Sequence, residues 1–279
     1  MSATSKFLIA GLVAYFAYKW IVPSDTKELG SLKHASKSVK YYREDYWKES
    51  GYFDFPTGKT HYYYIGPKDG IRVVFVHGLG VPPPAMAEFL NQLAERGFRI
   101  LTFETYGRGY SDSPGVVYNE DLFVDQLAMV ALKSGWEKFN IIGFSLGGAI
   151  TAGFVSRFPE HVEKIALVAP VGIMKENFRI VQSEHLAYNP GLLRALRSTI
   201  LNFKFGGFAN DFKMIEKSHQ NKILGIWGSH DQSVPTELSS ELQELMPSMR
   251  LVIKEGLGHE ILLEDTPFSV NTIDSYFKE

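Results

Sequence analysis

A serine flanked by glycines stands at positions 143–148, which read GFSLGG. The run follows an apolar stretch, 139–142, and leads into a helix-like stretch, 149–158. Glycines remove side-chain clashes and permit backbone angles that other residues resist, so a sharp turn can expose the Ser145 hydroxyl. A strand, a turn and a helix are the context that a nucleophile elbow requires. Ser145 is therefore the candidate nucleophile.

A serine hydroxyl is a weak nucleophile, so a base has to lie within hydrogen-bond reach to take its proton. Eight histidines compete for this role. Seven stand in the expected linker, hairpin, lid, helix connection or strand ends, namely His34, His61, His77, His161, His185, His219 and His230. His259 lies in the loop EGLGHE after the last expected strand, where glycines leave room for the imidazole to reach over the sheet edge. We predict His259 as the general base; the alternative is a surface loop histidine.

The histidine in turn needs an orienting carboxylate. Asp231 ends the run WGSHD, directly after the strand expected over 223–227. Open α/β sheets place their sites at the carboxyl ends of the strands. The chain order Ser, Asp, His is the one described for hydrolases of this layout. The alternative is a turn-forming aspartate beside Pro235. Because the preceding strand end, 169–172, holds no carboxylate, Asp231 is the candidate acid.

Acyl transfer also develops a negative charge on an oxygen, and backbone N–H groups have to be in position to stabilise it. Leu146, the residue after the serine, offers one N–H at a helix N-terminus. The run HGLG at 77–80 ends the strand expected over 71–76, and Leu79 is the candidate second donor. The alternative for this run is an ordinary glycine-rich turn.

Other chemistry-bearing patterns are incomplete. The run PTGKT at 56–60 resembles the end of a phosphate-binding loop, but Phe53 stands where a glycine is required. A dinucleotide fingerprint after a strand and a histidine–carboxylate metal spacing on a helix are both missing from the sequence. The chain has no cysteine, which excludes disulfides, thiolate catalysis and Cys-based metal sites. We therefore expect no cofactor and no metal.

Strands and helices alternate along most of the chain. Apolar runs predict strands, which are expected at 71–76, 98–103, 139–143, 164–168, 223–227 and 251–254. Amphipathic runs predict helices, which are expected at 82–97, 120–135, 146–158, 236–246 and 267–277. A hairpin is expected before them, from 52–55 and 62–65. The alternation predicts an α/β fold with a mostly parallel, doubly wound sheet.

The alternation pauses between residues 172 and 222, where the chain is helix-like and aromatic and is broken by NPG at 189–191 and GG at 206–207. We predict a small helical lid, inserted at about 172–222 into one α/β domain that spans 46–279. Residues 25–45 are polar and of mixed charge, which is typical of a linker.

The N-terminus differs in kind. Residues 7–22, FLIAGLVAYFAYKWIV, are apolar except for Lys19 and carry aromatic residues near their end. A full membrane span needs roughly 20 apolar residues, so this one is short, but Lys19 can snorkel and the aromatic residues suit an interface. We predict an N-terminal hydrophobic helix that anchors the protein to a membrane, with residues 1–24 as the anchor. A targeting peptide and a core or partner helix are the alternatives.

Charge predicts an orientation and excludes one class of partner. Five basic residues follow the apolar segment before position 44, whereas only Lys6 and the amino terminus precede it. If the segment spans, the large domain faces the cytoplasm. The formal net charge of −2 gives no reason to expect nucleic acid as a partner.

The sequence resembles the α/β-hydrolase superfamily from about Tyr46 to Glu279. Four landmarks appear in order along the chain, namely HG at 77–78, GRGxSD at 107–112, GxSxG at 143–147, and Asp231 followed by His259. The resemblance implies Ser145 as nucleophile, His259 as base and Asp231 as orienting acid. It implies the oxyanion donors Leu79 and Leu146. The residues before the second landmark, ETY at 104–106, differ from the family's commoner Asp-x-Arg pattern, with no evident effect on chemistry.

The resemblance implies a serine hydrolase that cleaves a carboxylic ester through an acyl-serine intermediate. The apolar N-terminus and the aromatic lid favour a lipid or acylglycerol-type substrate, as in membrane-anchored monoacylglycerol lipases and related esterases. A thioesterase, a C–C bond hydrolase and an acyltransferase would use the same three residues. Epoxide hydrolases and dehalogenases of this fold have an aspartate nucleophile, so Ser145 argues against both. A non-catalytic, membrane-tethered binding module is the alternative of another class.

Overall fold

An eight-stranded sheet forms the centre of the computed structural model, which describes residues 31–32, 42–175 and 191–279. Its strands, in chain order, are β1 Glu49–Phe55, β2 Gly58–Ile65, β3 Ile71–Val76, β4 Phe98–Phe103, β5 Phe139–Phe144, β6 Val162–Val168, β7 Ile223–Gly228 and β8 Arg250–Lys254. Their order across the sheet is β1-β2-β4-β3-β5-β6-β7-β8. The two pairings of β2 are antiparallel and the others are parallel, so the predicted mostly parallel sheet is confirmed.

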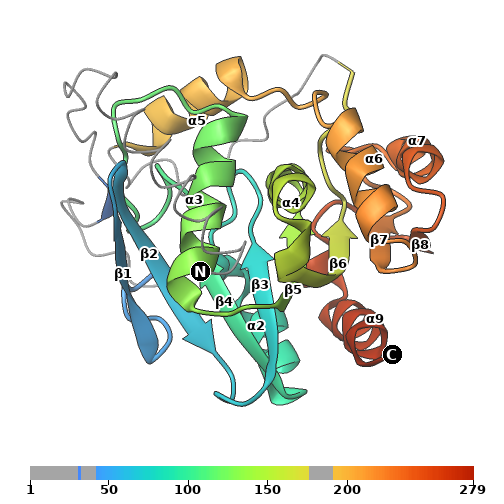
Figure 1. Ribbon diagram of the computed structural model, residues 1–279, viewed down its shortest axis with the longest axis horizontal. Helices are drawn as coiled ribbons and strands as arrows, with labels where there is room; N and C mark the ends of the chain where they lie inside the picture. The colour runs from blue at the N-terminus through green and yellow to red at the C-terminus, as the bar shows by residue number, and fades with distance from the viewer. Residues whose placement is uncertain (1–30, 33–41, 176–190) are drawn as a thin grey trace, which may run out of the picture.

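Helices cover both faces of this sheet (Figure 1). The helices are α2 Ala87–Glu95, α3 Glu120–Ser134, α4 Leu146–Arg157, α5 Leu192–Asn202, α6 Ala209–Ser218, α7 Glu237–Leu245, α8 Ile261–Glu264 and α9 Thr266–Lys278, with 3₁₀ turns at Pro83–Met86 and Pro159–His161. Side chains of α3, α4, α6 and α7 share one buried core with one sheet face, and those of α2, α8 and α9 share a second core with the other. The predicted helices are confirmed; α8 was not predicted.

The central strand β3 shows why residues 73–76 are all apolar, whereas Ile71 and Arg72 at its start are exposed. Val74 and Val76 belong to the core on one face of the sheet, and Val73 and Phe75 belong to the core on the other. Side chains alternate between faces along a strand, so a strand covered on both sides has to be apolar at every position. The hairpin is also confirmed, with β1 and β2 longer than predicted.

The direction of winding reverses at β3, which pairs with β4 on one side and β5 on the other. The chain leaves β3 for β4 and later returns to β5, so the loops after β3 and β5 diverge at their carboxyl ends. Open α/β sheets form their binding crevice at such a switch point. Val76 pairs with Gly143, which brings the run 77–80 beside Ser145.

Two helices lie in the region of the predicted lid. Figure 1 shows α5 at the top of the molecule, above α3. Helix α6 instead packs against α4 and α7, in the layer of crossover helices. Residues 176–190 lie outside the described residues, and the extent of the lid stays a prediction.

The predicted anchor, 1–24, lies outside the described residues. Within the described part of the chain, no helix combines the length and the apolar character that a membrane crossing requires. Parts of the predicted linker are described, and there Leu32 and Tyr42 are buried. The Leu32 N–H donates to the Gly109 carbonyl at 3.0 Å, so these residues pack on the α/β domain.

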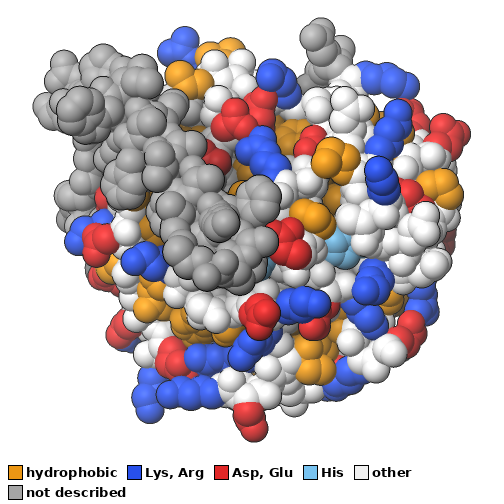
Figure 2. Space-filling view, viewed as in Figure 1, with side chains coloured by type: hydrophobic (Ala, Val, Ile, Leu, Met, Phe, Trp, Pro, Cys, Tyr) orange, Lys and Arg blue, Asp and Glu red, His pale blue; other side chains and the backbone are white. Residues whose placement is uncertain are grey.

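Basic and acidic side chains are interspersed over the face of the molecule in Figure 2, with hydrophobic side chains between them. Such mixing of charge on this face (Figure 2) is consistent with the small formal net charge of −2.

Candidate active site

Ser145 occupies a sharp turn between β5 and α4. Its backbone has φ 53° and ψ −116°, a strained conformation for a residue with a side chain. The turn is fixed by the backbone, since the Ser145 N–H donates to the Val168 carbonyl at 2.9 Å and the Ser145 carbonyl accepts from the Gly148 N–H at 2.9 Å. The hydroxyl is thereby held out of the regular path of strand and helix, at the carboxyl edge of the sheet.

The glycines around Ser145 are required by close contacts. A Cβ atom at Gly147 would lie 2.0 Å from the Val76 carbonyl oxygen, and one at Gly143 would lie 2.6 Å from the Gly147 carbonyl oxygen. Both distances are too short for any side chain. The start of α4 can therefore lie directly against the end of β3 only because these positions have no side chain.

The three residues predicted from distant parts of the chain lie together. The Ser145 Oγ is 3.0 Å from His259 Nε2, and His259 Nδ1 is 2.7 Å from Asp231 Oδ2. Ser145 and Asp231 are buried, and the His259 side chain is 14% exposed. The imidazole also packs beside the Phe144 ring, with centroids 5.2 Å apart. The serine hydroxyl, the imidazole and the carboxylate thus form a continuous chain of hydrogen bonds.

Asp231 is fixed by the loop that follows β7. Its Oδ1 accepts hydrogen bonds from the Ser233 and Val234 N–H groups, both at 2.8 Å. Its Oδ2 is left to accept from His259 Nδ1. A neutral imidazole that donates from Nδ1 has a free lone pair on Nε2, which faces the Ser145 hydroxyl. This tautomer is the one that can take the serine proton.

The loop at 77–80 lies against the serine. A Cβ at Gly78 would lie 3.3 Å from the Ser145 Cβ. The His77 ring holds the loop, because Nε2 accepts from the Thr105 N–H at 3.0 Å and Nδ1 therefore carries the proton that goes to the Gly78 carbonyl, 2.7 Å away. The carbonyl and N–H of a trans peptide point in opposite directions. The Leu79 N–H consequently points away from the His77 ring.

His77 predicts a pH dependence of stability. Burial lowers the pKa of His77 to about 4, from an unfolded value of about 6.5. As the pH falls, the unfolded chain takes up a proton at this histidine before the folded protein does. The free energy of unfolding is therefore not reduced by His77 above about pH 6.5, and it falls as the pH drops toward about 4. At about 1.4 kcal/mol per pKa unit, the loss amounts to about 3 kcal/mol. In His77→Gln the free energy of unfolding should fall less steeply over this range.

The measurement is urea unfolding of both proteins at several pH values between 4 and 7. The slope, not the absolute stability, is compared, because the substitution also removes a hydrogen bond. Burial lowers the pKa of His219 as well, and that contribution is present in both proteins. Equal slopes would show that His77 is not the group responsible.

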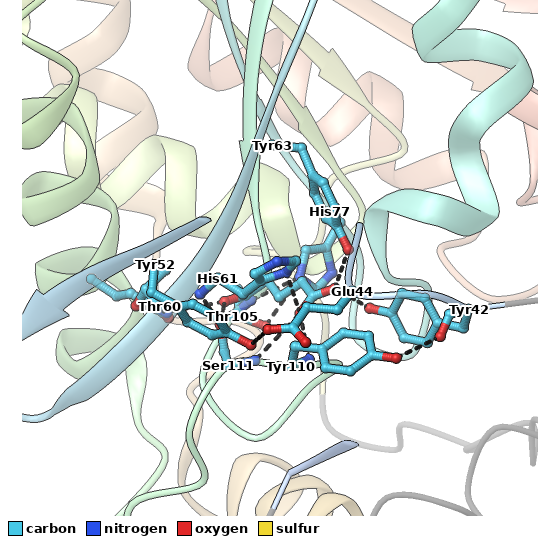
Figure 3. A network of polar contacts seen from close by, with 12 residues as sticks. Tyr42, Glu44, Tyr52, Thr60, His61, Tyr63, His77, Thr105, Tyr110 and Ser111 are labelled. Atoms are coloured by element: carbon cyan, nitrogen blue, oxygen red, sulfur yellow. Dashed lines mark hydrogen bonds and ion pairs between the residues drawn. The ribbon is translucent and has the colours of Figure 1, made fainter. Parts of the chain in front are cut away.

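A buried carboxylate, Glu104, organises the loop after β4. Figure 3 shows residues of its surroundings, among them Tyr42, His61 and Tyr63. Its Oε1 accepts from the hydroxyls of Tyr42 and of Tyr63, the latter at 3.2 Å. Its Oε2 accepts from the backbone of Tyr110 and lies 3.4 Å from the Nδ1 of His61. Side chains from β2 and the N-terminal segment and a backbone N–H of the β4 loop therefore converge on one carboxylate. The proximity of Glu104 raises the pKa of Tyr63 further above the value set by burial.

Sequence reasoning missed the roles of His77 and Glu104. His77 stands at a strand end, where other roles are plausible. Glu104 stands where the family commonly has Asp, and we expected this difference to have no effect on the chemistry. A polar residue directly after a buried strand was the available signal in both cases. The aromatic residues Phe203 and Phe208 are buried. The Phe203 ring lies 5.5 Å from the Phe208 ring and 6.1 Å from the Phe123 ring, centroid to centroid. They contribute to the core rather than offering a visible substrate surface.

Comparisons with known proteins bear on this arrangement. The family described as alpha/beta hydrolase fold matches residues 71–199. The chain is 31% identical over 246 residues to the AB hydrolase superfamily protein YisY of Bacillus subtilis, covering 75% of this chain and 91% of that protein. It is 25% identical over 247 residues to 2-hydroxy-6-oxo-2,4-heptadienoate hydrolase of Pseudomonas putida, covering 74% and 89%.

Among solved structures, a bromoperoxidase from Bacillus anthracis superposes with a TM-score of 0.70 at 18% identity, covering 83% of this chain and all of that one. A likeness at this identity shows the fold alone. The B. subtilis relative is similar enough, over most of both chains, to show a common family. Together with the eight-stranded sheet and the family match, this relationship shows that the chain belongs to the α/β-hydrolase superfamily, and its hydrolase-named relatives support hydrolase activity.

Proposed function

We propose that the protein is a serine hydrolase that cleaves a carboxylic ester through an acyl-Ser145 intermediate. One observation carries this proposal: Ser145 Oγ, His259 and Asp231 Oδ2 are joined by contacts of 3.0 and 2.7 Å at the carboxyl edge of the sheet. A hydroxyl with a base, and a base with an orienting carboxylate, is the arrangement that activates serine. A binding module would not need this alignment.

In the first half of the reaction, the Ser145 Oγ bonds to the carbonyl carbon of the ester while its proton passes to His259 Nε2. The carbonyl electron pair moves onto its oxygen, and the N–H groups of Leu79 and Leu146 are proposed to donate to that oxyanion. Asp231 stabilises the imidazolium that forms. The intermediate then collapses, the C–O bond to the alcohol breaks, and the departing oxygen takes the proton from His259.

In the second half, water attacks the acyl carbon and gives a proton to His259 Nε2. The same N–H groups stabilise the second oxyanion. The bond from the acyl carbon to Ser145 Oγ then breaks, and His259 returns the proton to the serine. The products are a carboxylic acid and an alcohol, and the protein ends in its starting state.

The proposed substrate class is an ester with an apolar acyl chain, of lipid or acylglycerol type. The support is the apolar segment 7–22, which would place the domain at a membrane. The described aromatic residues of the predicted lid add little, because they pack into the core.

A C–C bond hydrolase is the second candidate. The P. putida relative, which shares 25% identity over 89% of its length, is named as the hydrolase of 2-hydroxy-6-oxo-2,4-heptadienoate. The same serine, histidine and aspartate would serve that reaction, so the substrate has to be decided by assay.

The deciding experiment is a panel of substrates given to the full chain. p-Nitrophenyl esters of two to sixteen carbons and monoacylglycerols test the ester proposal, and an acyl thioester and a 2-hydroxy-6-oxo-dienoate test the alternatives. We expect the esters to be hydrolysed with the highest kcat/KM, rising with chain length. Faster turnover of the dienoate or of the thioester would replace the proposal by that alternative.

We also propose that residues 1–24 anchor the protein to a membrane, with the catalytic domain facing the cytoplasm. The full chain should stay in the membrane pellet after alkaline carbonate washing, and a chain lacking residues 1–24 should be soluble and equally active on a short-chain ester. Retention of the truncated chain in the pellet would contradict the anchor.

A further inference from the structure

Arg108 carries a buried positive charge, and it takes no part in the bond-making and proton-transfer steps of the proposed reaction. The residue is 2% exposed. Within residues 42–175 and 191–279, no acidic side chain pairs with it. Its three nitrogens donate to neutral oxygens instead, namely Nε to the Leu79 carbonyl at 3.3 Å, Nη1 to the Tyr106 carbonyl at 2.9 Å and Nη2 to Thr199 Oγ1 at 3.1 Å.

Such a group is costly for the fold. Removing a guanidinium from water without a carboxylate partner opposes folding, and a well-packed apolar side chain of similar size is often as good or better for stability. The Phe123 ring, 5.2 Å from Arg108 Cζ, offsets part of this cost. Burial lowers the pKa of Arg108 to about 10, so the group stays charged at neutral pH. Stability alone therefore gives no reason for an arginine at this position.

Its contacts point to the oxyanion loop, 77–80. Two peptide groups flank the Leu79 Cα. The Gly78 carbonyl of the first accepts from His77 Nδ1, and the Leu79 carbonyl of the second accepts from Arg108 Nε. Both peptide planes are thus fixed from outside, in a loop whose glycines would otherwise leave them free to rotate. The Leu79 N–H lies in the first plane, and the contact of Arg108 with the second plane limits rotation about the Leu79 Cα that would carry this N–H out of position.

The other end of the guanidinium reaches α5. Thr199 Oγ1, which accepts from Nη2, itself donates to the Ala195 carbonyl one turn earlier in this helix. The helix lies tightly against the same β4 loop, because a Cβ at Gly107 would lie 2.2 Å from the Ala195 Cβ. Arg108 therefore bridges the oxyanion loop and α5.

We propose that Arg108 is a positioning residue that fixes the peptide planes around Leu79 and makes the oxyanion hole depend on the docking of α5. The proposal deepens the proposed function and rests on it, since it requires an oxyanion at this loop. Arg108 touches no reacting atom in this account. The positive charge of Arg108, held against the Leu79 carbonyl, also stabilises the negative charge of the oxyanion that forms beside the loop.

Four variants of the full chain test the proposal. Arg108→Met removes charge and donors, and Arg108→Lys keeps the charge with a single donor head. Thr199→Val removes the acceptor on α5. Thr266→Val is the matched control, because Thr266 is also buried and makes the same contact to the carbonyl four residues earlier, at 2.8 Å, but does not touch Arg108.

A missing oxyanion donor lowers kcat by about 100- to 1,000-fold, so a misplaced one should cost about 10- to 100-fold in Arg108→Met. KM for a neutral p-nitrophenyl ester should change little. Arg108→Lys should recover part of the loss, Thr199→Val should lose about 3- to 10-fold by the same reasoning, and Thr266→Val should keep the wild-type kcat. The inhibition constant of a trifluoromethyl ketone, which mimics the oxyanion, should rise in proportion to the loss of kcat/KM.

Several outcomes would overturn the proposal. A kcat of Arg108→Met within two-fold of wild type would leave Arg108 a structural residue. Equal losses in Thr199→Val and Thr266→Val would assign the effect to helix packing. A raised KM confined to an anionic ester, the mono-p-nitrophenyl ester of succinate, would make Arg108 a substrate-anion site. If Arg108→Met does not fold, Arg108→Lys and Thr199→Val carry the same test.

The failure of the proposed function would look different. A wild-type protein that neither hydrolyses esters nor reacts with a fluorophosphonate at Ser145 would refute that function, and the role of Arg108 with it. An active, labelled wild type with an unaffected Arg108→Met would refute the role of Arg108 only.

Discussion

Ser145→Ala should lower kcat for ester hydrolysis by at least about 10⁴-fold, because loss of the nucleophile removes the covalent route. The fold should survive. The substitution keeps the Cβ, and the three backbone hydrogen bonds of residue 145, to Val168, Gly148 and Val171, do not involve the side chain. The measurement is the initial rate on a p-nitrophenyl ester, together with the melting temperature.

A buried serine elsewhere provides the control for this prediction. Ser239 on α7 is fully buried and its hydroxyl has no hydrogen-bond partner among the described residues, so Ser239→Ala should keep wild-type activity. Residual activity of Ser145→Ala above about one percent of wild type would count heavily against the serine as nucleophile.

Asp231→Asn should lower kcat by about 10⁴-fold while leaving the protein folded. The asparagine oxygen can take the place of Oδ1 and keep the hydrogen bonds from Ser233 and Val234. Its NH₂ group then faces His259 Nδ1, which has to accept rather than donate. The imidazole proton moves to Nε2 and points at Ser145, so the ring can no longer take the serine proton.

The matched control is Asp265→Asn, since Asp265 also accepts a backbone hydrogen bond, from the Phe268 N–H at 3.0 Å, and loses the same charge. This variant should keep wild-type kcat. An Asp231→Asn protein with more than about a tenth of wild-type kcat would mean that the tautomer of His259 is not set by this carboxylate.

The site residues could be singled out from the sequence because parallel strands end at one edge of the sheet. A serine after β5, an aspartate after β7 and a histidine after β8 were expected to meet there, and contacts of 3.0 and 2.7 Å join them in the structure. The continuous apolar runs and the order of the elements were sufficient for this, since they determine which strand ends are neighbours.

The surroundings of these residues could not be predicted in the same way. Glu104 and Arg108 are charged residues in a loop, and periodicity carries no information on whether a loop residue is buried. Their roles depend on contacts with Tyr42, Leu79 and Thr199, which lie far away in the chain. The short helix α8 was also missed, because four residues give no helical period.

The measurement that tests the central claim most directly is peptide mass spectrometry after reaction with a fluorophosphonate. The tryptic peptide 139–157 contains two serines, 145 and 156, so fragmentation has to locate the adduct. We predict one adduct per chain, on Ser145, which excess ester substrate slows and which Asp231→Asn nearly abolishes. Ester turnover by a protein that carries its adduct on another residue, or that carries none, would contradict the account.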